Sequence, residues 1–96
     1  MSNQLPDRVR REICRFARQN GVRKVTLFGS RARGLHTDRS DIDLAVTGGC
    51  FESFEMDIRE KTHSLLMFDV VDLDAGVSEA LKEEIERDGI VIYEEA

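Results

Sequence analysis

The stretch that decides the fold runs from residue 23 to residue 45, with the sequence RKVTLFGSRARGLHTDRSDIDLA. The segment VTLF predicts a strand that leads directly into Gly29 and Ser30. A second apolar run with alternating acids carries Asp41 and Asp43. Side chains two residues apart in a strand point to the same face, so this pair of carboxylates predicts a metal-binding face.

The Gly-Ser pair stands at the end of the first predicted strand. A tight turn into a helix at this point would direct backbone N–H groups at an anion, because the first turn of a helix leaves them without intrahelical acceptors. We expect a short helix over residues 29–34 and a polar loop over 35–40. The sequence therefore predicts that a phosphate-binding turn and a pair of metal ligands belong to one site.

A third carboxylate for this site is available in residues 67–74, MFDVVDLD, which predict another strand. Asp69 and Asp72 are an odd number of residues apart, so a regular strand places them on opposite faces and only one faces the site. Asp69 is flanked by apolar residues, and we expect it to be buried, whereas Asp72 and Asp74 lie nearer a turn. A one-residue bulge would exchange Asp69 and Asp72, so the choice between them stays open.

The rest of the chain alternates helical and extended patterns. Apolar spacing predicts helices over residues 7–20, 51–65 and 77–88, and strands over 25–28, 41–46, 67–73 and 90–93. The first helix also carries four arginines on the face opposite its apolar residues, namely Arg8, Arg11, Arg15 and Arg18. This stripe is either a solvated charged face or a docking surface for an acidic partner or a nucleotide tail.

Length and composition restrict the class of protein. A chain of 96 residues suits a single domain over residues 1–96, with no second domain to hold a substrate. The formal charge of −5 argues against broad nucleic-acid binding, although ten of the 14 basic residues lie within the first 39. No apolar run suits a membrane span and no secretory signal is evident, so we expect a cytoplasmic protein with Cys14 and Cys50 reduced.

Three features together resemble a known signature: the string GSRARG, the ten residues between Ser30 and Asp41, and the segment SDIDL. This pattern is similar to the G-S-x(10)-D-x-D motif of the DNA polymerase β-like nucleotidyltransferase superfamily. The short chain looks most like the minimal nucleotidyltransferases, antitoxins of small all-helical HEPN-domain toxins. The resemblance covers essentially the whole chain, and implies an α+β nucleotidyltransferase-like fold, a small mixed sheet with helices packed against one face.

The resemblance also implies a reaction: transfer of AMP from ATP, with release of pyrophosphate, to a hydroxyl of a HEPN-type toxin, expected to be a tyrosine. The residues implied to bind the triphosphate are Gly29, Ser30, Arg31 and Arg33. Those implied to bind two Mg²⁺ ions and to carry catalysis are Asp41, Asp43 and Asp69. For Arg31 and Arg33, a role as solvated helix arginines is the alternative.

The sequence leaves two hypotheses about the function. In the first, the chain is a protein adenylyltransferase that silences a toxin. In the alternative, it is a non-catalytic antitoxin that neutralises the toxin by forming a complex. The gathered carboxylates favour catalysis, because a pure binder has no reason to bring repelling charges together without a metal. Transfer to a small molecule or an RNA end is disfavoured by the missing second domain and the acidic charge. Homo- and hetero-oligomers both remain open.

Overall fold

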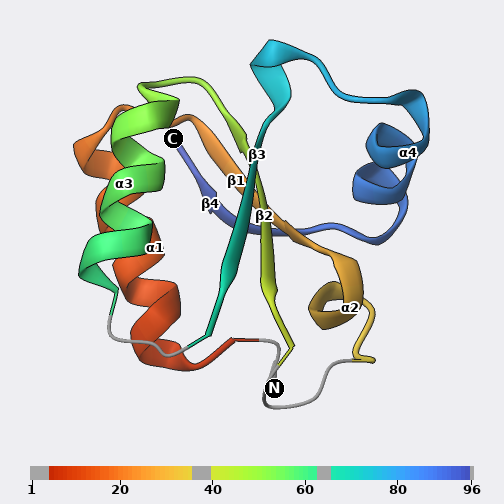
Figure 1. Ribbon diagram of the computed structural model, residues 1–96, viewed down its shortest axis with the longest axis horizontal. Helices are drawn as coiled ribbons and strands as arrows, with labels where there is room; N and C mark the ends of the chain where they lie inside the picture. The colour runs from red at the N-terminus through yellow and green to blue at the C-terminus, as the bar shows by residue number, and fades with distance from the viewer. Residues whose placement is uncertain (1–4, 36–39, 63–65, 96) are drawn as a thin grey trace.

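The computed structural model describes residues 5–35, 40–62 and 66–95, and its helices and strands confirm the predicted α+β class (Figure 1). The elements in chain order are α1 (Asp7–Gln19), β1 (Lys24–Phe28), α2 (Gly29–Ala32), β2 (Ile42–Thr47), α3 (Phe51–Lys61), β3 (Phe68–Asp72), the 3₁₀ helix η1 (Leu73–Ala75), α4 (Glu79–Asp88) and β4 (Ile90–Glu94).

The four strands form one mixed sheet with the order β3-β2-β1-β4. Strand β1 pairs antiparallel with both β2 and β4, whereas β2 pairs parallel with β3. A parallel pair needs a crossover connection, and α3 lies in that connection. The sheet therefore has β3 at one edge and β4 at the other, and the predicted mixed sheet is confirmed.

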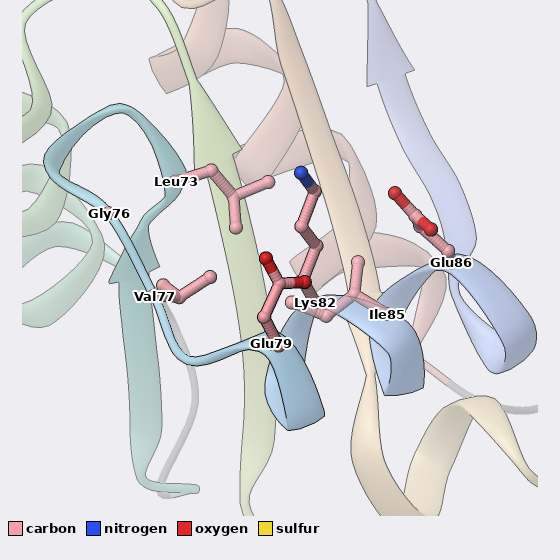
Figure 2. Close-up of a pocket in the computed structure, with 7 residues that line it drawn as sticks. All are labelled: Leu73, Gly76, Val77, Glu79, Lys82, Ile85 and Glu86. Carbon is pink, nitrogen blue, oxygen red and sulfur yellow. The ribbon is translucent and has the colours of Figure 1, made fainter.

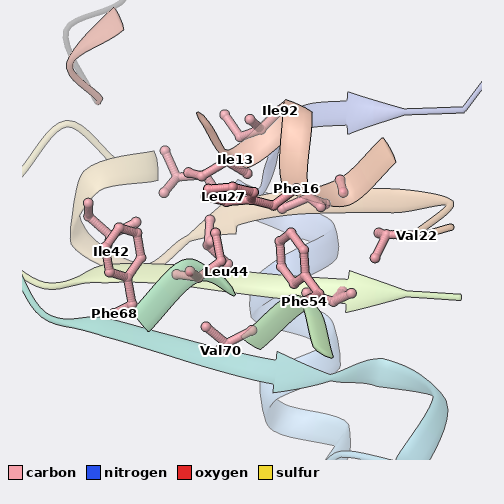
Figure 3. Packing of buried hydrophobic residues seen from close by; sticks show 14 of the residues in the cluster. Ile13, Phe16, Val22, Leu27, Ile42, Leu44, Phe54, Phe68, Val70 and Ile92 are labelled. Atoms are coloured by element: carbon pink, nitrogen blue, oxygen red, sulfur yellow. The ribbon is translucent and has the colours of Figure 1, made fainter. Parts of the chain in front are cut away.

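The main core lies between one face of the sheet and helices α1 and α3 (Figures 1 and 3). Every second residue of β2 points into this core, and Ile42, Leu44 and Val46 are completely buried. Helix α3 contributes Phe54 and Ile58, which are also completely buried. The apolar face of helix α1, opposite the arginines, is buried, and its residues are Val9, Ile13, Phe16 and Ala17.

Helix α4 covers part of the opposite face of the sheet. Its buried residue Ile85 packs with Phe28 of β1 and Ala45 of β2 in a second, smaller cluster. Val71, Leu73 and Leu81 are only partly buried around that cluster. The helices were expected on one face of the sheet only, whereas α4 lies on the other face.

The predicted boundaries are correct to within one or two residues for most elements. Helix α3 is shorter than its apolar spacing suggested, and Thr62 after it donates its hydroxyl to the carbonyl of Ile58 at 2.7 Å. Residues 36–39 of the loop predicted over 35–40, and residues 63–65 of the helix predicted over 51–65, lie outside the described residues. Both cysteines are free, and the side chains of the α1 arginine stripe are exposed.

No helix in the described part of the chain combines the length and the apolar composition that a membrane crossing requires.

The composition of the core predicts how substitutions change the free energy of unfolding. Replacing completely buried Phe54 by alanine should lower the free energy of unfolding by about 3–5 kcal/mol, because a cavity is left between α3 and the sheet. The matched variant Met56→Ala, on the same helix at a side chain that is 58% exposed, should change it little. Urea unfolding followed by circular dichroism measures both, and equal losses would contradict this assignment of the core.

Candidate functional site

Two aspartates meet on the face of the sheet that α4 covers in part. In the parallel pairing of β2 with β3, Asp43 stands directly opposite Asp69. Neighbours in register share a face, and both residues alternate with residues of the main core. Asp41 precedes β2 by one residue and lies two residues before Asp43, with its side chain exposed. The structure thus places the three predicted carboxylates at one end of the β2–β3 pair.

These carboxylates affect one another electrostatically. The pKa of Asp43 is raised from 3.8 to about 6, first by its partial burial and then by the negative charges of Asp69, Asp41 and Glu84. The guanidinium of Arg33 acts in the opposite direction. Burial and mutual repulsion thus disfavour the ionised carboxylates, and a bound divalent cation would offset both effects. Carboxylate oxygens are also the ligands that hard divalent cations prefer. Within residues 5–35, 40–62 and 66–95, however, no three His, Cys, Asp or Glu side chains converge as a ready metal site.

The Gly29–Ser30 turn lies directly against Asp43. Phe28, the last residue of β1, pairs with Asp43, and the chain then turns into α2 with a φ of +76° at Gly29. A Cβ atom at position 29 would overlap a carboxylate oxygen of Asp43. Glycine is therefore required twice, for the left-handed backbone and for the close approach to the carboxylate. The predicted phosphate turn and the predicted metal ligands occupy one site.

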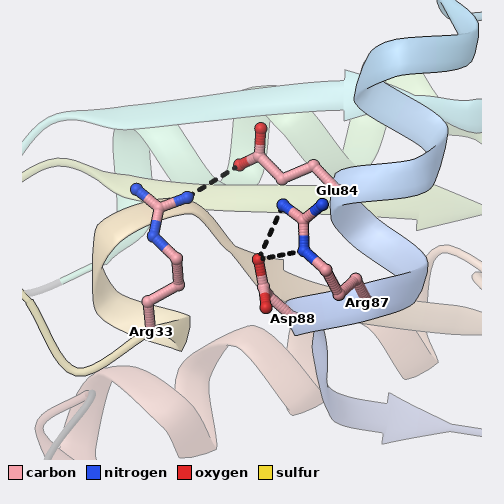
Figure 4. A network of polar contacts seen from close by, with 4 residues as sticks. All are labelled: Arg33, Glu84, Arg87 and Asp88. Atoms are coloured by element: carbon pink, nitrogen blue, oxygen red, sulfur yellow. Dashed lines mark hydrogen bonds and ion pairs between the residues drawn. The ribbon is translucent and has the colours of Figure 1, made fainter.

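The two arginines of α2 and its C-cap occupy different environments. Arg31 is buried, with 3% of its surface exposed, and its Nε donates to the carbonyl of Ser40 at 3.1 Å. This bond ties α2 to the segment that leads into β2, so Arg31 helps to position the turn. Arg33 is partly exposed, and its Nη1 lies 3.5 Å from Oε2 of Glu84 on α4 (Figure 4). Arg33, the C-cap of α2, is therefore a cation whose charge acts on the Asp43 carboxylate.

The sequence over residues 11–96 matches the family described as Polymerase beta, Nucleotidyltransferase. The chain belongs to this nucleotidyltransferase family. A search among curated proteins gives no significant match.

Solved structures of the nucleotidyltransferase fold agree with this family. A toxin–antitoxin complex with AMP-PNP contains a chain that is 25% identical, with a TM-score of 0.70; the match covers 90% of this chain and 73% of that one. A doubly substituted MntA–HpeT toxin–antitoxin complex is 23% identical, with a TM-score of 0.69 and coverages of 90% and 73%. A complex of tri-AMPylated Shewanella oneidensis HEPN toxin with MNT antitoxin is 22% identical, with a TM-score of 0.63 and coverages of 91% and 71%.

The structure corrects one expectation about the third strand. Asp69 was expected to be buried, but its side chain is exposed, because β3 is an edge strand and α4 does not cover its start. Asp72 follows the parity of the core residues Phe68 and Val70. Its carboxylate accepts the N–H of Asp74 at 3.0 Å and so caps η1. The register of β3 therefore places Asp69, and not Asp72, beside Asp43.

Glu84 is a site residue that the sequence analysis missed. It pairs with Arg33 and adds negative charge near Asp43, although it lies about 40 residues further along the chain. The apolar spacing predicted a helix over residues 77–88, but it contained no signal for where that helix packs. The nucleotidyltransferase motif does not include this position either.

The close approach of Gly29 to the Asp43 carboxylate leads to a second prediction about stability. Gly29→Ala should destabilise the protein by more than the about 1–2 kcal/mol expected for alanine in a left-handed conformation, because the new methyl group also displaces Asp43. Gly34→Ala is the matched control, since its φ is +74° and no described atom lies within 4 Å of an added Cβ. Chemical denaturation gives both values. Equal costs at the two positions would contradict a tight contact at Gly29.

Proposed function

We propose that this nucleotidyltransferase moves AMP from ATP to a hydroxyl of a protein partner, and that the partner is a HEPN-type toxin that the transfer silences. The acceptor is expected to be a tyrosine. The observation that carries the proposal is the register of Asp43 with Asp69, with Asp41 two residues away and the Gly29–Ser30 turn packed against Asp43. This arrangement joins a phosphate-binding turn to a cluster of oxygen ligands.

Magnesium is the cofactor that this donor set suits. The carboxylates of Asp41, Asp43 and Asp69 would hold the two ions, and bound Mg²⁺ would neutralise the phosphate charges during transfer. The raised pKa of Asp43 supports this assignment, because the protein alone leaves the repulsion among these carboxylates uncompensated. Gly29 and Ser30 would bind the β- and γ-phosphates, and Arg33 would add positive charge beside them.

The proposed step is a displacement at the α-phosphorus of ATP. The acceptor oxygen forms a bond to this phosphorus, the bond to the oxygen that bridges to the β-phosphate breaks, and pyrophosphate leaves. The acceptor proton passes to the carboxylate of Asp69. Asp69 is exposed on the edge strand, so an acceptor carried by another molecule has access to it. Arg31 maintains the position of the turn through its bond to Ser40.

The partner is inferred from the related structures. The 25% identical chain comes from a toxin–antitoxin complex that holds AMP-PNP, an analogue of ATP. Another structure of the same fold contains a tri-AMPylated HEPN toxin with its MNT antitoxin. These complexes support both the protein class of the partner and the transferred group.

Magnesium binding should appear as a change in thermal stability. At pH 8 without Mg²⁺, Asp43→Asn should raise the melting temperature by a few degrees, because it removes repulsion among the carboxylates. Mg²⁺ should raise the melting temperature of the wild type but not of Asp43→Asn or Asp69→Asn. Asp72→Asn is the control and should keep its Mg²⁺ response. A response that disappears in Asp72→Asn and persists in Asp69→Asn would contradict the proposed ligand set.

AMP transfer should be visible in the mass of the partner. Incubation of a HEPN-type partner toxin with the protein, ATP and Mg²⁺ should add one or more AMP units to the toxin. Asp41→Asn should reduce the rate by at least about a thousandfold, because one ligand of both metal ions is lost. Intact-protein mass spectrometry measures the product, and tryptic fragments locate the acceptor.

The same experiment separates catalysis from simple complex formation. The activity of the toxin is measured in parallel with its mass, with wild-type protein and with Asp41→Asn. If the wild-type protein inhibits the toxin without adding AMP, and Asp41→Asn inhibits it equally well, the catalytic proposal is wrong. The protein would then be a non-catalytic antitoxin that neutralises the toxin by forming a complex.

A further inference from the structure

The arginine stripe of α1 has no part in the proposed catalytic site. Its members are exposed and follow one another at intervals of three or four residues, so they extend along one side of the helix over about 15 Å. They are Arg8, Arg11, Arg15 and Arg18. Helix α1 packs beside α3 on the main-core face of the sheet, whereas α4 and the carboxylates lie on the other face (Figure 1). A molecule bound to the stripe would therefore leave the carboxylates uncovered.

The described part of the chain does not neutralise the stripe. No ion pair between two described residues involves any of its four arginines. On the neighbouring helix α3, by contrast, Arg59 pairs with Glu55 and Lys61 pairs with Asp57, each at 3.1 Å. An ordinary solvated helix face mixes opposite charges in the way that α3 does. The stripe gathers charges of one sign instead.

Exposed acidic side chains gather on α4, which is separated from α1 by the sheet. Glu79, Glu83 and Glu86 are exposed there. Two of these three, Glu79 and Glu86, line a cavity of about 260 Å³ together with Lys82 (Figure 2). Because these carboxylates lie on the opposite face of the sheet, they cannot pair with the stripe of the same molecule.

The stripe is locally unfavourable for the helix that carries it. Like charges three or four residues apart on a helix repel each other. Arg8 also places positive charge in the first turn of α1, where the helix dipole favours negative charge. A sequence that breaks local rules without a local gain indicates a functional surface.

The stripe borders a surface hollow of about 360 Å³. Its lining consists of Arg8, Arg11, Glu12 and Arg15, so three guanidinium groups outweigh one carboxylate and the net charge is positive. Arg15 lies over the ring of Phe16, with its Cζ atom 5.1 Å from the ring centroid. Guanidinium groups form paired hydrogen bonds with carboxylates, so the hollow suits acidic side chains.

We propose that the arginine stripe is a docking surface for an acidic helix of a protein partner. Carboxylates at every third or fourth residue of such a helix repeat with the spacing of the stripe, so several guanidinium–carboxylate pairs form together. The inference goes beyond the proposed function, because the stripe and the catalytic carboxylates lie on opposite faces of the sheet. The docked helix does not have to carry the acceptor of AMP.

The charges around the stripe favour a protein helix over a nucleic acid. Helix α3 and strand β4 pack against α1. Exposed acids on these two elements are Glu52 and Glu60 of α3 and Glu94 of β4. A nucleic acid carries phosphate charges along its whole length, so it would extend beyond the stripe towards these acids. A helix with one acidic side places its charges on the stripe alone.

The test uses two synthetic helical peptides of equal composition and the whole protein. In the one-sided peptide, glutamates stand at positions i, i+3, i+7 and i+10, and in the other they are distributed around the helix. Fluorescence anisotropy measures binding of the labelled peptides. The one-sided peptide should bind about tenfold more tightly, and added salt should weaken its binding, because the contacts are exposed ion pairs.

Substitutions locate the binding surface. Arg11→Glu with Arg15→Glu should weaken binding of the one-sided peptide about tenfold or more, because attraction is replaced by repulsion. Arg11→Gln with Arg15→Gln is a milder change and should weaken it less. Arg59→Glu with Lys61→Glu alters the net charge equally on α3 and should leave the affinity unchanged. Thermal unfolding followed by circular dichroism verifies that each variant folds.

Equal affinity for the two peptides would overturn the proposal, as would equal binding by the stripe variants and the α3 control. A single-stranded RNA is the competing probe. If it binds more tightly than the one-sided peptide and loses affinity only in the stripe variants, the surface binds nucleic acid and the proposal is wrong. Stripe-dependent oligomers of the protein alone, detected by light scattering, would instead identify α4 of a second copy as the acidic helix and overturn a separate partner. None of these measurements requires AMP transfer, so their failure leaves the proposed function unaffected.

Discussion

The contact between the backbone of Gly29 and the carboxylate of Asp43 is the constraint on which the rest of the site depends. A side chain at position 29 would have to displace that carboxylate, because its Cβ atom would overlap it. The contact exists because β1 pairs with β2 in a register that sets Phe28 opposite Asp43. The parallel pairing of β2 with β3 then places Asp69 on the other side of Asp43. Two strand registers thus bring together the turn, Asp43 and Asp69.

The clustering of carboxylates around Asp43 destabilises the folded protein. The buried core on the opposite face of the sheet holds β2 in place. Like charges and partial burial raise the pKa of Asp43, so its ionised form is disfavoured in the folded protein. The residues on either side of it, Ile42 and Leu44, are completely buried beneath α1 and α3. Because side chains alternate along β2, the same strand provides the core on one face and the carboxylates on the other.

Helix α4 gives the carboxylate face its shape. It is attached to the sheet through the small cluster around Ile85, and its Glu84 pairs with Arg33 beside α2. Between α4 and the end of β3 it leaves an open cavity, and it leaves Asp69 exposed at the sheet edge. In the proposed reaction, the triphosphate lies at the Gly29–Ser30 turn and the acceptor approaches from the uncovered edge. A chain of this size can therefore bind one substrate while another molecule presents the second.

The sequence by itself determined the helices, the strands, the turn at Gly29 and the shared face of Asp41 and Asp43, because these follow from local spacing. It also established by parity that Asp69 and Asp72 face opposite ways. Only the tertiary structure decided which of them joins Asp43, since that depends on the register between strands about 26 residues apart. The exposure of Asp69 follows from the edge position of β3, and the role of Glu84 from the packing of α4. Neither is encoded in local periodicity, because strand order and helix placement arise from contacts between distant segments.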